Sequence, residues 1–188
     1  MSKINSEHTW IDAGYSQFGA EGLEGLQVER LSRITGLNKS GYYHYFGDKE
    51  TFLEKLMENH QTLASIFAED LRQIKEFDPE FMEVLIKHTP KLMFHNQLVR
   101  NREEKILEKC YNLVNDIIDP IASKLFGNFI GLKDNNAFSF RYFQQVRDTF
   151  YSQITLKRMN YLFLRDFMYE ARDVIQRALE LGSERKKM

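Results

Sequence analysis

Residues 26–53 read LQVERLSRITGLNKSGYYHYFGDKETFL, and this stretch is the most informative part of the chain. Its first half has an apolar residue at every third position: Val28, Leu31 and Ile34. This spacing predicts a short helix with one apolar stripe that faces inward. Gly36 can then adopt a left-handed backbone without a steric penalty, which predicts a tight turn. A second short helix is predicted from about Asn38 to Tyr45, and a helix–turn–helix layout places such a helix in the major groove of DNA.

The predicted second helix and the residues just after it carry the candidate contacts with DNA. Three side chains are expected to face base edges: Lys39, Ser40 and His44. Three more are expected to contact phosphates: Tyr43, Tyr45 and Lys49. Gly41 has no side chain, so we expect the helix backbone to lie close to the groove at this position. Lys49 also lies at the start of a longer predicted helix, whose N-terminal dipole and free N–H groups favour phosphate.

The same stretch resembles the N-terminal domain of the TetR family of one-component transcriptional regulators. The resemblance runs along GLNKSGYYHYFGDKETFL, from the turn glycine through the polar residue and lysine at Asn38 and Lys39 and the aromatic residues to the apolar pair at its end. Upstream, three residues stand where the first helix of that family has its core side: Trp10, Ala13 and Phe18. The resemblance covers roughly residues 4–56. It implies a DNA-binding head, a helical body that binds an effector, and a dimer whose last two helices pair into a four-helix bundle.

The stretch departs from the family pattern at three positions. Leu26 replaces the Ser or Thr that caps the second helix of the family, which leaves Gly25 or Glu24 as a weaker cap. Gly14 lies inside the predicted first helix, where glycine costs about 1 kcal/mol relative to alanine. Gly41 stands where family members often have Thr or Ala. Together these departures predict a head of marginal stability.

Length and composition predict a globular protein. A chain of 188 residues forms one large or two small domains, and an apolar fraction of 43% is ordinary for a soluble protein with a buried core. The N-terminus lacks the apolar segment of a signal peptide, and no stretch approaches the ~18 apolar residues of a membrane span. The single cysteine, Cys110, cannot form an internal disulfide. We therefore expect a cytoplasmic protein that does not contact a membrane.

Charge argues against a strongly DNA-binding head. Residues 1–60 contain six Lys and Arg residues and nine Asp and Glu residues, whereas a DNA-binding domain is expected to be basic. Binding would therefore depend on local contacts, above all through Lys39 and Lys49, and on the doubling of the head in a dimer.

The rest of the chain predicts an all-α body. Seven of the ten glycines fall at or before Gly47, so we place a DNA-binding domain at residues 1–47 and a ligand-binding and dimerisation domain at residues 48–188. A long helix capped by Asp48 is expected to run to the break at Asp78–Pro79 and to be shared by head and body. Further helices are predicted from apolar periodicity and proline positions: Pro79 to about Pro90, Gln97–Phe126 with a kink at Pro120, Asn136–Gln153, and Thr155–Leu181.

The final predicted helix is apolar over a wide arc, which predicts that a second chain covers part of it. We assign the dimer interface to one stripe of this helix together with one residue of the preceding helix: Phe150, Leu164, Met168, Ala171 and Ile175. A second apolar stripe lies beside the first: Phe163, Phe167, Val174 and Leu181.

No catalytic motif, phosphate-binding loop or paired cysteines occur, and the five histidines are scattered, so we expect no enzyme, no metal and no cofactor. The leading hypothesis is a ligand-responsive regulator, most simply a repressor. It binds an inverted-repeat operator in double-stranded DNA as a homodimer, and a small, mostly apolar effector releases it. Four aromatic residues are candidates for the effector site: Phe94, Tyr111, Phe140 and Phe143. The acidic head and Gly41 favour an alternative hypothesis, a helical interaction protein with a vestigial head. An all-helical enzyme is the third hypothesis.

Overall fold

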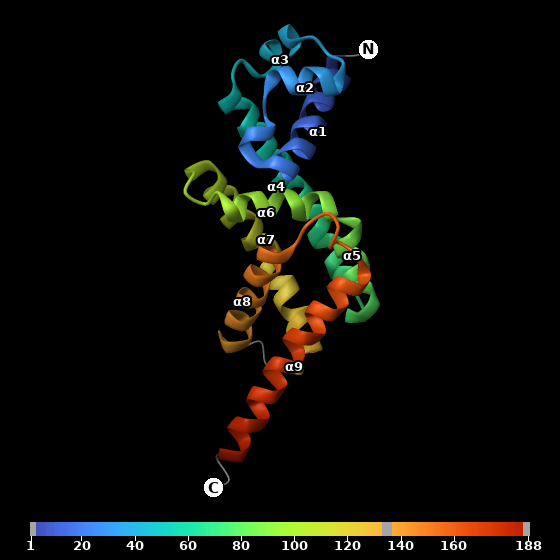
Figure 1. The fold of residues 1–188 in the computed structure, drawn as a ribbon, viewed down its shortest axis with the longest axis vertical. Helices are drawn as coiled ribbons and strands as arrows, with labels where there is room; N and C mark the ends of the chain where they lie inside the picture. Colours follow the sequence, from blue (N-terminus) through green and yellow to red (C-terminus); the bar gives the residue numbers. More distant parts are fainter. Residues whose placement is uncertain (1–2, 133–136, 186–188) are drawn as a thin grey trace. The chain divides into compact units, whose positions relative to one another are not determined.

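The computed structural model describes residues 3–132 and 137–185, and every regular element within these ranges is a helix (Figure 1). The predicted all-α fold, with an N-terminal helix–turn–helix and a larger helical body, is confirmed. The N-terminal elements are α1 (Lys3–Glu21), η1 (Gly22–Gly25), α2 (Val28–Thr35), α3 (Lys39–Phe46) and α4 (Lys49–Gln73). The later elements are η2 (Phe77–Phe81), α5 (Met82–Lys87), α6 (Thr89–Arg100), α7 (Lys105–Phe129), α8 (Ala137–Gln153) and α9 (Tyr161–Arg185).

The helices group into two compact units. The first unit contains α1 to α3, α4 up to Ile66, and the segment Pro90–Asp116. The second unit contains the end of α4, residues up to Thr89, and the chain from Ile117 onward. Two long helices, α4 and α7, therefore contribute residues to both units. The division of function at residue 47 stays a prediction.

The turn between α2 and α3 forms as the sequence predicts. Gly36 has φ 69°, in the left-handed region, and ends α2. The side chain of Asn38 accepts a hydrogen bond from the Ser40 backbone N–H at 3.0 Å and caps α3. The expectation for the cap of α2 was wrong, because Gln27 occupies that position and makes no side-chain cap hydrogen bond.

The apolar stripe predicted for α2 is only partly buried. Leu31 is fully buried, whereas Ile34 is 50% exposed. Each residue of an α-helix turns by about 100°, so residues at three-residue intervals drift around the axis by about 60° per step. Ile34 thus lies about 120° from Val28 and has left the inner face. Ile34 was wrongly predicted to face inward.

Aromatic side chains form the core beneath the helix–turn–helix. Tyr42 and Phe52 are fully buried, and their ring centroids lie 5.0 Å apart. Gly14 of α1 packs directly on Phe52 of α4, because a Cβ added at Gly14 would lie 2.4 Å from Phe52 Cζ. The glycine that breaks the family pattern inside α1 is thus required by the close packing of two helices.

Helix ends in the body differ from the sequence expectations near the prolines. Asp48 caps α4, and its carboxylate accepts the Thr51 N–H at 2.7 Å. Helix α4 ends at Gln73 rather than at Asp78, and Asp78 is extended (φ −114°, ψ 122°), as the residue before a proline prefers. Pro79 lies inside η2 instead of opening a long helix.

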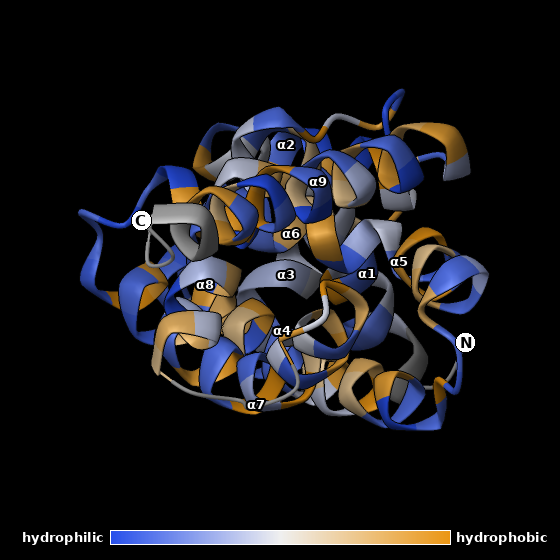
Figure 2. Cartoon of the chain, turned by 90° about the horizontal axis from the view of Figure 1, so that it is seen from below, coloured by the Kyte–Doolittle hydropathy of each residue, from blue (hydrophilic) through white to orange (hydrophobic). Residues whose placement is uncertain are grey.

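Two further boundaries were also wrong. Pro90 lies in the first turn of α6, where its missing N–H costs nothing, so it begins a helix instead of ending one. Asn160, not Thr155, caps the last helix, because its side chain accepts the Phe163 N–H at 3.1 Å. Figure 2 shows that helices such as α7 and α9 carry both hydrophobic and hydrophilic residues. Such mixed helices can bury a hydrophobic side and expose a hydrophilic one.

Asp78 joins α9 to the segment before α5 within the second unit. The hydroxyls of Tyr161 and Tyr169 donate hydrogen bonds to the two carboxylate oxygens of Asp78, at 2.6 and 2.8 Å. The Tyr161 hydrogen bond is the main cause that lowers the pKa of Asp78. These bonds fix the first two turns of α9 against this segment.

A chain of buried polar groups lies inside the first unit. The Tyr15 hydroxyl is 2.7 Å from His60 Nδ1, and His60 Nε2 is 3.3 Å from His95 Nδ1. Both histidines are buried, and the nearby Lys91 ammonium donates to the Leu63 carbonyl at 2.6 Å. Burial is the main cause that lowers the pKa of His60 well below its usual value, and the charges of His95 and Lys91 lower it further.

This depressed pKa predicts loss of stability in mild acid. Unfolded histidine takes up a proton below about pH 6.5, whereas folded His60 stays neutral at that pH. The unfolded state therefore binds more protons, and the free energy of unfolding falls as the pH drops through about 6.5. Thermal unfolding between about pH 7.5 and 5.5 measures this slope. We expect His60→Gln to flatten it and the exposed-site control His8→Gln to leave it unchanged; equal slopes in all three proteins would contradict the assignment.

Candidate nucleic-acid interface

Helix α3 presents a polar face outward and an aromatic face inward. Tyr42 and Phe46, four residues apart, are buried in the core, which turns the opposite face of the helix to solvent. The exposed residues of the predicted set are Lys39, Ser40, Tyr43 and His44 on α3, and Lys49 at the start of α4. Tyr45 is half-buried. Lys39, Ser40, Tyr43 and His44 thus share the solvent-facing side of α3.

Gly41 lies differently from the rest of the predicted set. A Cβ added at this position would meet Trp10 Nε1 of α1 at 3.9 Å, so Gly41 faces the contact between α3 and α1. A side chain here would point toward Trp10. The Trp10 indole N–H is buried and has no hydrogen-bond acceptor among the described residues. The close approach of the Gly41 backbone to DNA stays a prediction.

Ser40 is engaged at the start of α3. Its hydroxyl lies 3.2 Å from the Asn38 side-chain oxygen that also accepts its backbone N–H. Sequence reasoning missed Asn38 as a positioning residue, although asparagine is among the preferred N-caps and precedes the helix directly. By fixing the first turn of α3, Asn38 sets the direction in which Lys39 and Ser40 project.

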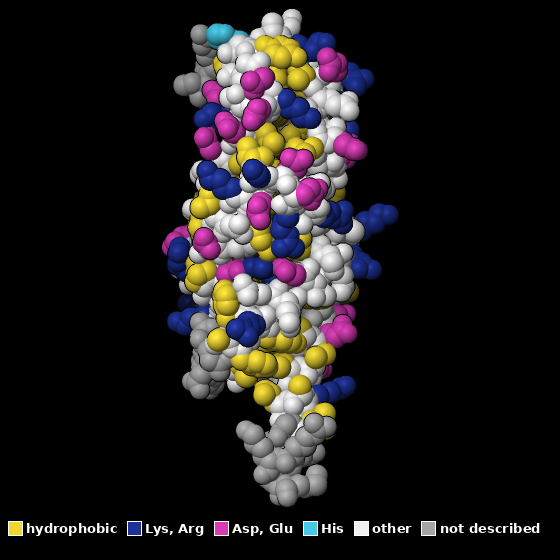
Figure 3. Space-filling view, turned by 90° about the vertical axis from the view of Figure 1, so that its left-hand side faces the viewer, with side chains coloured by type: hydrophobic (Ala, Val, Ile, Leu, Met, Phe, Trp, Pro, Cys, Tyr) yellow, Lys and Arg dark blue, Asp and Glu magenta, His cyan; other side chains and the backbone are white. Residues whose placement is uncertain are grey.

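The cations near α3 are paired within the chain. Lys39 Nζ lies 3.1 Å from a carboxylate oxygen of Glu29 in α2, and Lys49 Nζ donates to the Leu23 carbonyl at 3.2 Å. Arg30 makes two hydrogen bonds to the Glu21 carboxylate, and these bonds are the main cause that lowers the pKa of Glu21. In Figure 3, basic and acidic side chains lie side by side over the upper part of the molecule, where α1 to α3 lie in Figure 1.

Four of the five residues assigned to the dimer interface are buried within the chain itself. Phe150, Leu164, Met168 and Ile175 are each at most 6% exposed, because they fill the core of the second unit of the chain itself. Ala171 is half-buried, and its carbonyl accepts the Tyr142 hydroxyl. Little of this stripe remains for a partner.

The single chain leaves the second stripe of α9 only partly covered. Val174 and Leu181 are 57% and 63% exposed, and Phe163 and Phe167 are half-buried. A groove of about 300 Å³ runs between α8 and α9. It is lined by Tyr142, Gln145, Val146, Thr149, Gln153, Phe167, Glu170, Ala171 and Val174. Figure 3 also shows hydrophobic side chains gathered low on the side of the molecule where Figure 1 places α8.

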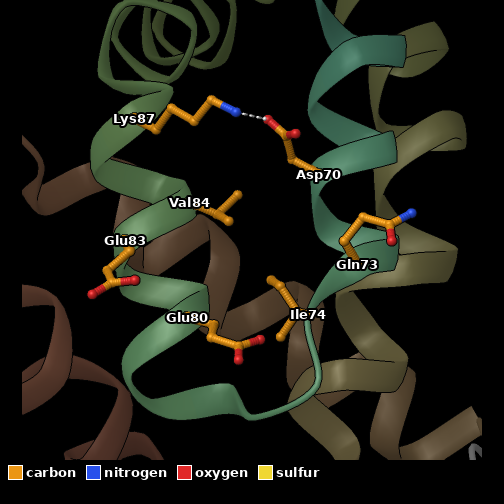
Figure 4. Close-up of a pocket in the computed structure, with 7 residues that line it drawn as sticks. All are labelled: Asp70, Gln73, Ile74, Glu80, Glu83, Val84 and Lys87. Carbon is orange, nitrogen blue, oxygen red and sulfur yellow. Dashed lines mark hydrogen bonds and ion pairs between the residues drawn. The ribbon is translucent and has the colours of Figure 1, made fainter.

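A second groove, of about 330 Å³, lies between the end of α4 and α5 (Figure 4). Lys87 reaches across it to Asp70 at 2.8 Å, and Asp70 also pairs with the buried His88. Ile74 and Val84 lie below this ion pair, whereas Glu83 points away from α4. The groove is open, and its strongest charges already neutralise each other, so it has no clear preference for a ligand.

The four candidate effector residues fall in different units. Phe94 is fully buried and stacks on Tyr15 with ring centroids 4.3 Å apart, and Tyr111 stacks on His95 at 5.3 Å. Both belong to the first unit, whereas Phe140 and Phe143 belong to the second. Neither groove described above is lined by any of the four. Their role in effector binding stays a prediction.

Within residues 3–132 and 137–185, no three His, Cys, Asp or Glu residues come together as metal ligands would. No helix in these ranges combines the length and the apolar character that crossing a membrane demands.

Residues 11–56 match the family model described as bacterial regulatory proteins, tetR family. The HTH-type transcriptional repressor AcnR of Corynebacterium glutamicum is 33% identical over 67 residues, which cover 35% of this chain and 36% of that protein. AcnR of Corynebacterium efficiens is 32% identical over 68 residues, which cover 36% of each chain. The matched stretch thus spans about a third of the length of these relatives.

The whole fold resembles a solved structure. A protein from Rhodococcus sp. that is assigned to the TetR family of transcriptional regulators superimposes with a TM-score of 0.59, over 94% of this chain and 98% of that chain. The sequence identity is 13%, so this likeness concerns the fold alone.

Proposed function

We propose that the chain is a transcriptional repressor that binds operator DNA through α3, since residues 11–56 match the family model of the bacterial regulatory proteins of the tetR family. The observation that carries the proposal is the surface of α3, where Lys39, Ser40, Tyr43 and His44 are exposed above a core of aromatic residues. A helix held rigidly from behind, with polar and basic side chains in front, has what entry into a major groove requires.

The DNA contacts divide into two kinds. Lys39, Ser40 and His44 are proposed to touch base edges, which carry sequence information. Tyr43, Tyr45 and Lys49 are proposed to contact phosphates, which position the head but do not distinguish sequences. Lys49 begins α4, whose N-terminus favours phosphate, and its ammonium would leave the Leu23 carbonyl, 3.2 Å away, to make this contact.

We propose a homodimer formed by the exposed stripe of α9 and the groove beside α8. Phe163, Phe167, Val174 and Leu181 are the residues of this stripe. A two-fold axis relates the heads, so the operator is an inverted repeat with half-site centres about 34–36 Å apart or a multiple of that distance. The buried surface should be on the order of 2,000 Å².

We further propose that the protein works in the cytoplasm, is not an enzyme, and responds to a small, mostly apolar effector. The support is the aromatic content of the body, including Phe94, Tyr111, Phe140 and Phe143 as candidate lining. An effector that favours the form not bound to DNA by about 1.4 kcal/mol lowers DNA affinity tenfold. Apolar compounds that raise the melting temperature should also release DNA. If none of the stabilising compounds changes DNA affinity, the effector proposal is wrong.

Two substitutions test the proposed function on duplexes that the chain selects from a random-sequence pool. Lys49→Ala should weaken binding to all sequences equally and flatten the dependence of log K on log salt by about 0.9 per lost phosphate contact. His44→Ala should instead change which sequences are selected. Affinity at several salt concentrations, followed by sequencing of the selected duplexes, measures both effects.

Lys75→Ala, which removes an exposed cation outside the head, is the matched control and should bind DNA as the unmodified chain does. If the unmodified chain selects no DNA, the chain is better explained as a helical interaction protein with a vestigial head. If it selects DNA but both substitutions are silent, the assignment of the DNA-binding surface is wrong.

A further inference from the structure

One ion pair lies on the surface that is proposed to meet DNA. Lys39, the first residue of α3, places its Nζ 3.1 Å from Oε1 of Glu29 in the first turn of α2. The two side chains are 49% and 67% exposed, so a DNA phosphate or base edge can reach the lysine from solvent. The Glu29 carboxylate therefore already binds the Lys39 ammonium that DNA is proposed to contact.

The pairing also bears on the charge balance of the head. Residues 1–60 contain more acidic than basic residues, and Arg30 is held by Glu21 in the same way as Lys39 is held by Glu29. A DNA-binding surface gains affinity by exchanging condensed counterions for its own cations. A cation that already has an anionic partner must leave that partner first, so its contact with DNA adds less to the affinity.

Resting on the proposed DNA-binding function, we propose that Glu29 is an intramolecular competitor of DNA: its carboxylate holds Lys39 and thereby lowers the affinity of each head. DNA binding then requires that Lys39 leave Glu29 for a phosphate or a base edge. The residue sets affinity without touching DNA, because it acts through Lys39.

Glu29 also has a local structural role that a test must separate. It lies in the first turn of α2, where an acidic residue interacts favourably with the helix dipole. Hydrogen bonding with its own backbone is the main cause that lowers the pKa of Glu29, and the bond to Lys39 comes second. The cap residue Gln27 makes no side-chain capping hydrogen bond to α2, so this helix depends more on the acid in its first turn. A substitution at position 29 must therefore be judged by stability as well as by affinity.

The test is a double-mutant cycle in DNA affinity, measured by fluorescence anisotropy at several salt concentrations. The full-length proteins are the unmodified chain, Glu29→Gln, Lys39→Met and the double variant. The probes are a duplex selected from a random pool by the unmodified chain and a scrambled duplex. Glu29→Gln should tighten binding to the selected duplex, up to about fivefold per head and up to about 25-fold for a dimer that binds through two heads. In the Lys39→Met background the same substitution should have little effect.

Two further variants separate pairing from charge. Glu29→Asp keeps the negative charge and the acid in the first turn of α2 but shortens the side chain by one methylene, which moves its carboxylate away from Lys39 and weakens the pairing. Glu29→Asp should tighten DNA binding, as Glu29→Gln does. It remains a valid test of the pairing if Glu29→Gln unfolds α2. Glu24→Gln removes an exposed charge that forms no ion pair among the described residues, and it should change affinity less.

The outcomes separate this inference from the proposed function. If neither the unmodified chain nor Glu29→Gln binds DNA, the proposed function fails and the competitor role fails with it. If the unmodified chain binds and Glu29→Gln binds equally well, only the competitor role is overturned. Equal tightening in the Lys39→Met background, or by Glu24→Gln, overturns it too, because the effect then belongs to net charge alone.

Discussion

Val174→Glu is expected to leave the chain folded but monomeric and to lower its affinity for operator DNA by about a hundredfold or more. Val174 is 57% exposed on α9 and lines the groove beside Phe167. A two-fold axis brings the same patch of both chains together, so the substitution places two carboxylates in one apolar interface. A monomer has a single head and loses the gain in effective concentration that the second head provides.

Light scattering measures the mass, which should fall from twice 22.3 kDa to 22.3 kDa, and anisotropy measures the affinity. Gln176→Glu adds the same charge at an exposed position of α9 outside the stripe and should stay dimeric. Leu164→Glu, at a fully buried position, should unfold the second unit instead. A monomeric mass for the unmodified chain would rule out this interface.

Gly14→Ala is expected to destabilise the chain by about 1–3 kcal/mol, although alanine is the better helix former by about 1 kcal/mol. The added Cβ would lie 2.4 Å from Phe52 Cζ and 2.8 Å from Cε1, so a fully buried ring must move. Gly41→Ala should have the opposite sign, because its Cβ would meet only Trp10 Nε1, at 3.9 Å. There the gain in helix propensity, up to about 1 kcal/mol, remains.

Thermal unfolding followed by circular dichroism compares the two variants, with a shift of about 2–4 °C per kcal/mol for a chain of this size. Phe52→Leu provides the rescue, since a shorter side chain makes room for the methyl group. The double variant should recover part of the loss caused by Gly14→Ala. A Gly14→Ala protein as stable as the parent would show that α1 and α4 are not packed this closely.

The helix–turn–helix is predictable because its signals are local. Gly36 lies at the turn that it determines, and the N-cap Asn38, an equally local signal that sequence reasoning missed, directly precedes α3. The exposed candidates on α3 follow from the same short-range geometry.

Features that depend on distant residues are not predictable in this way. Both stripes of α9 are apolar, and only the packed chain shows that Leu164 and Ile175 serve its own core while Val174 is left outside. The partner of Lys39 lies ten residues earlier in another helix. Periodicity alone also cannot tell that Pro90 begins a helix, because proline is found both at the first turn of helices and just beyond their ends.

The contact between Gly14 and Phe52 has a consequence for how related sequences can diverge. Gly14 and Phe52 are thirty-eight positions apart in the chain but lie in direct contact in the core. A larger residue at one position therefore requires a smaller residue at the other. Homologues with alanine or a larger residue at position 14 should therefore carry a side chain smaller than phenylalanine at position 52. Position 41, where an added Cβ would meet only Trp10 Nε1, at 3.9 Å, should vary among small residues independently of both.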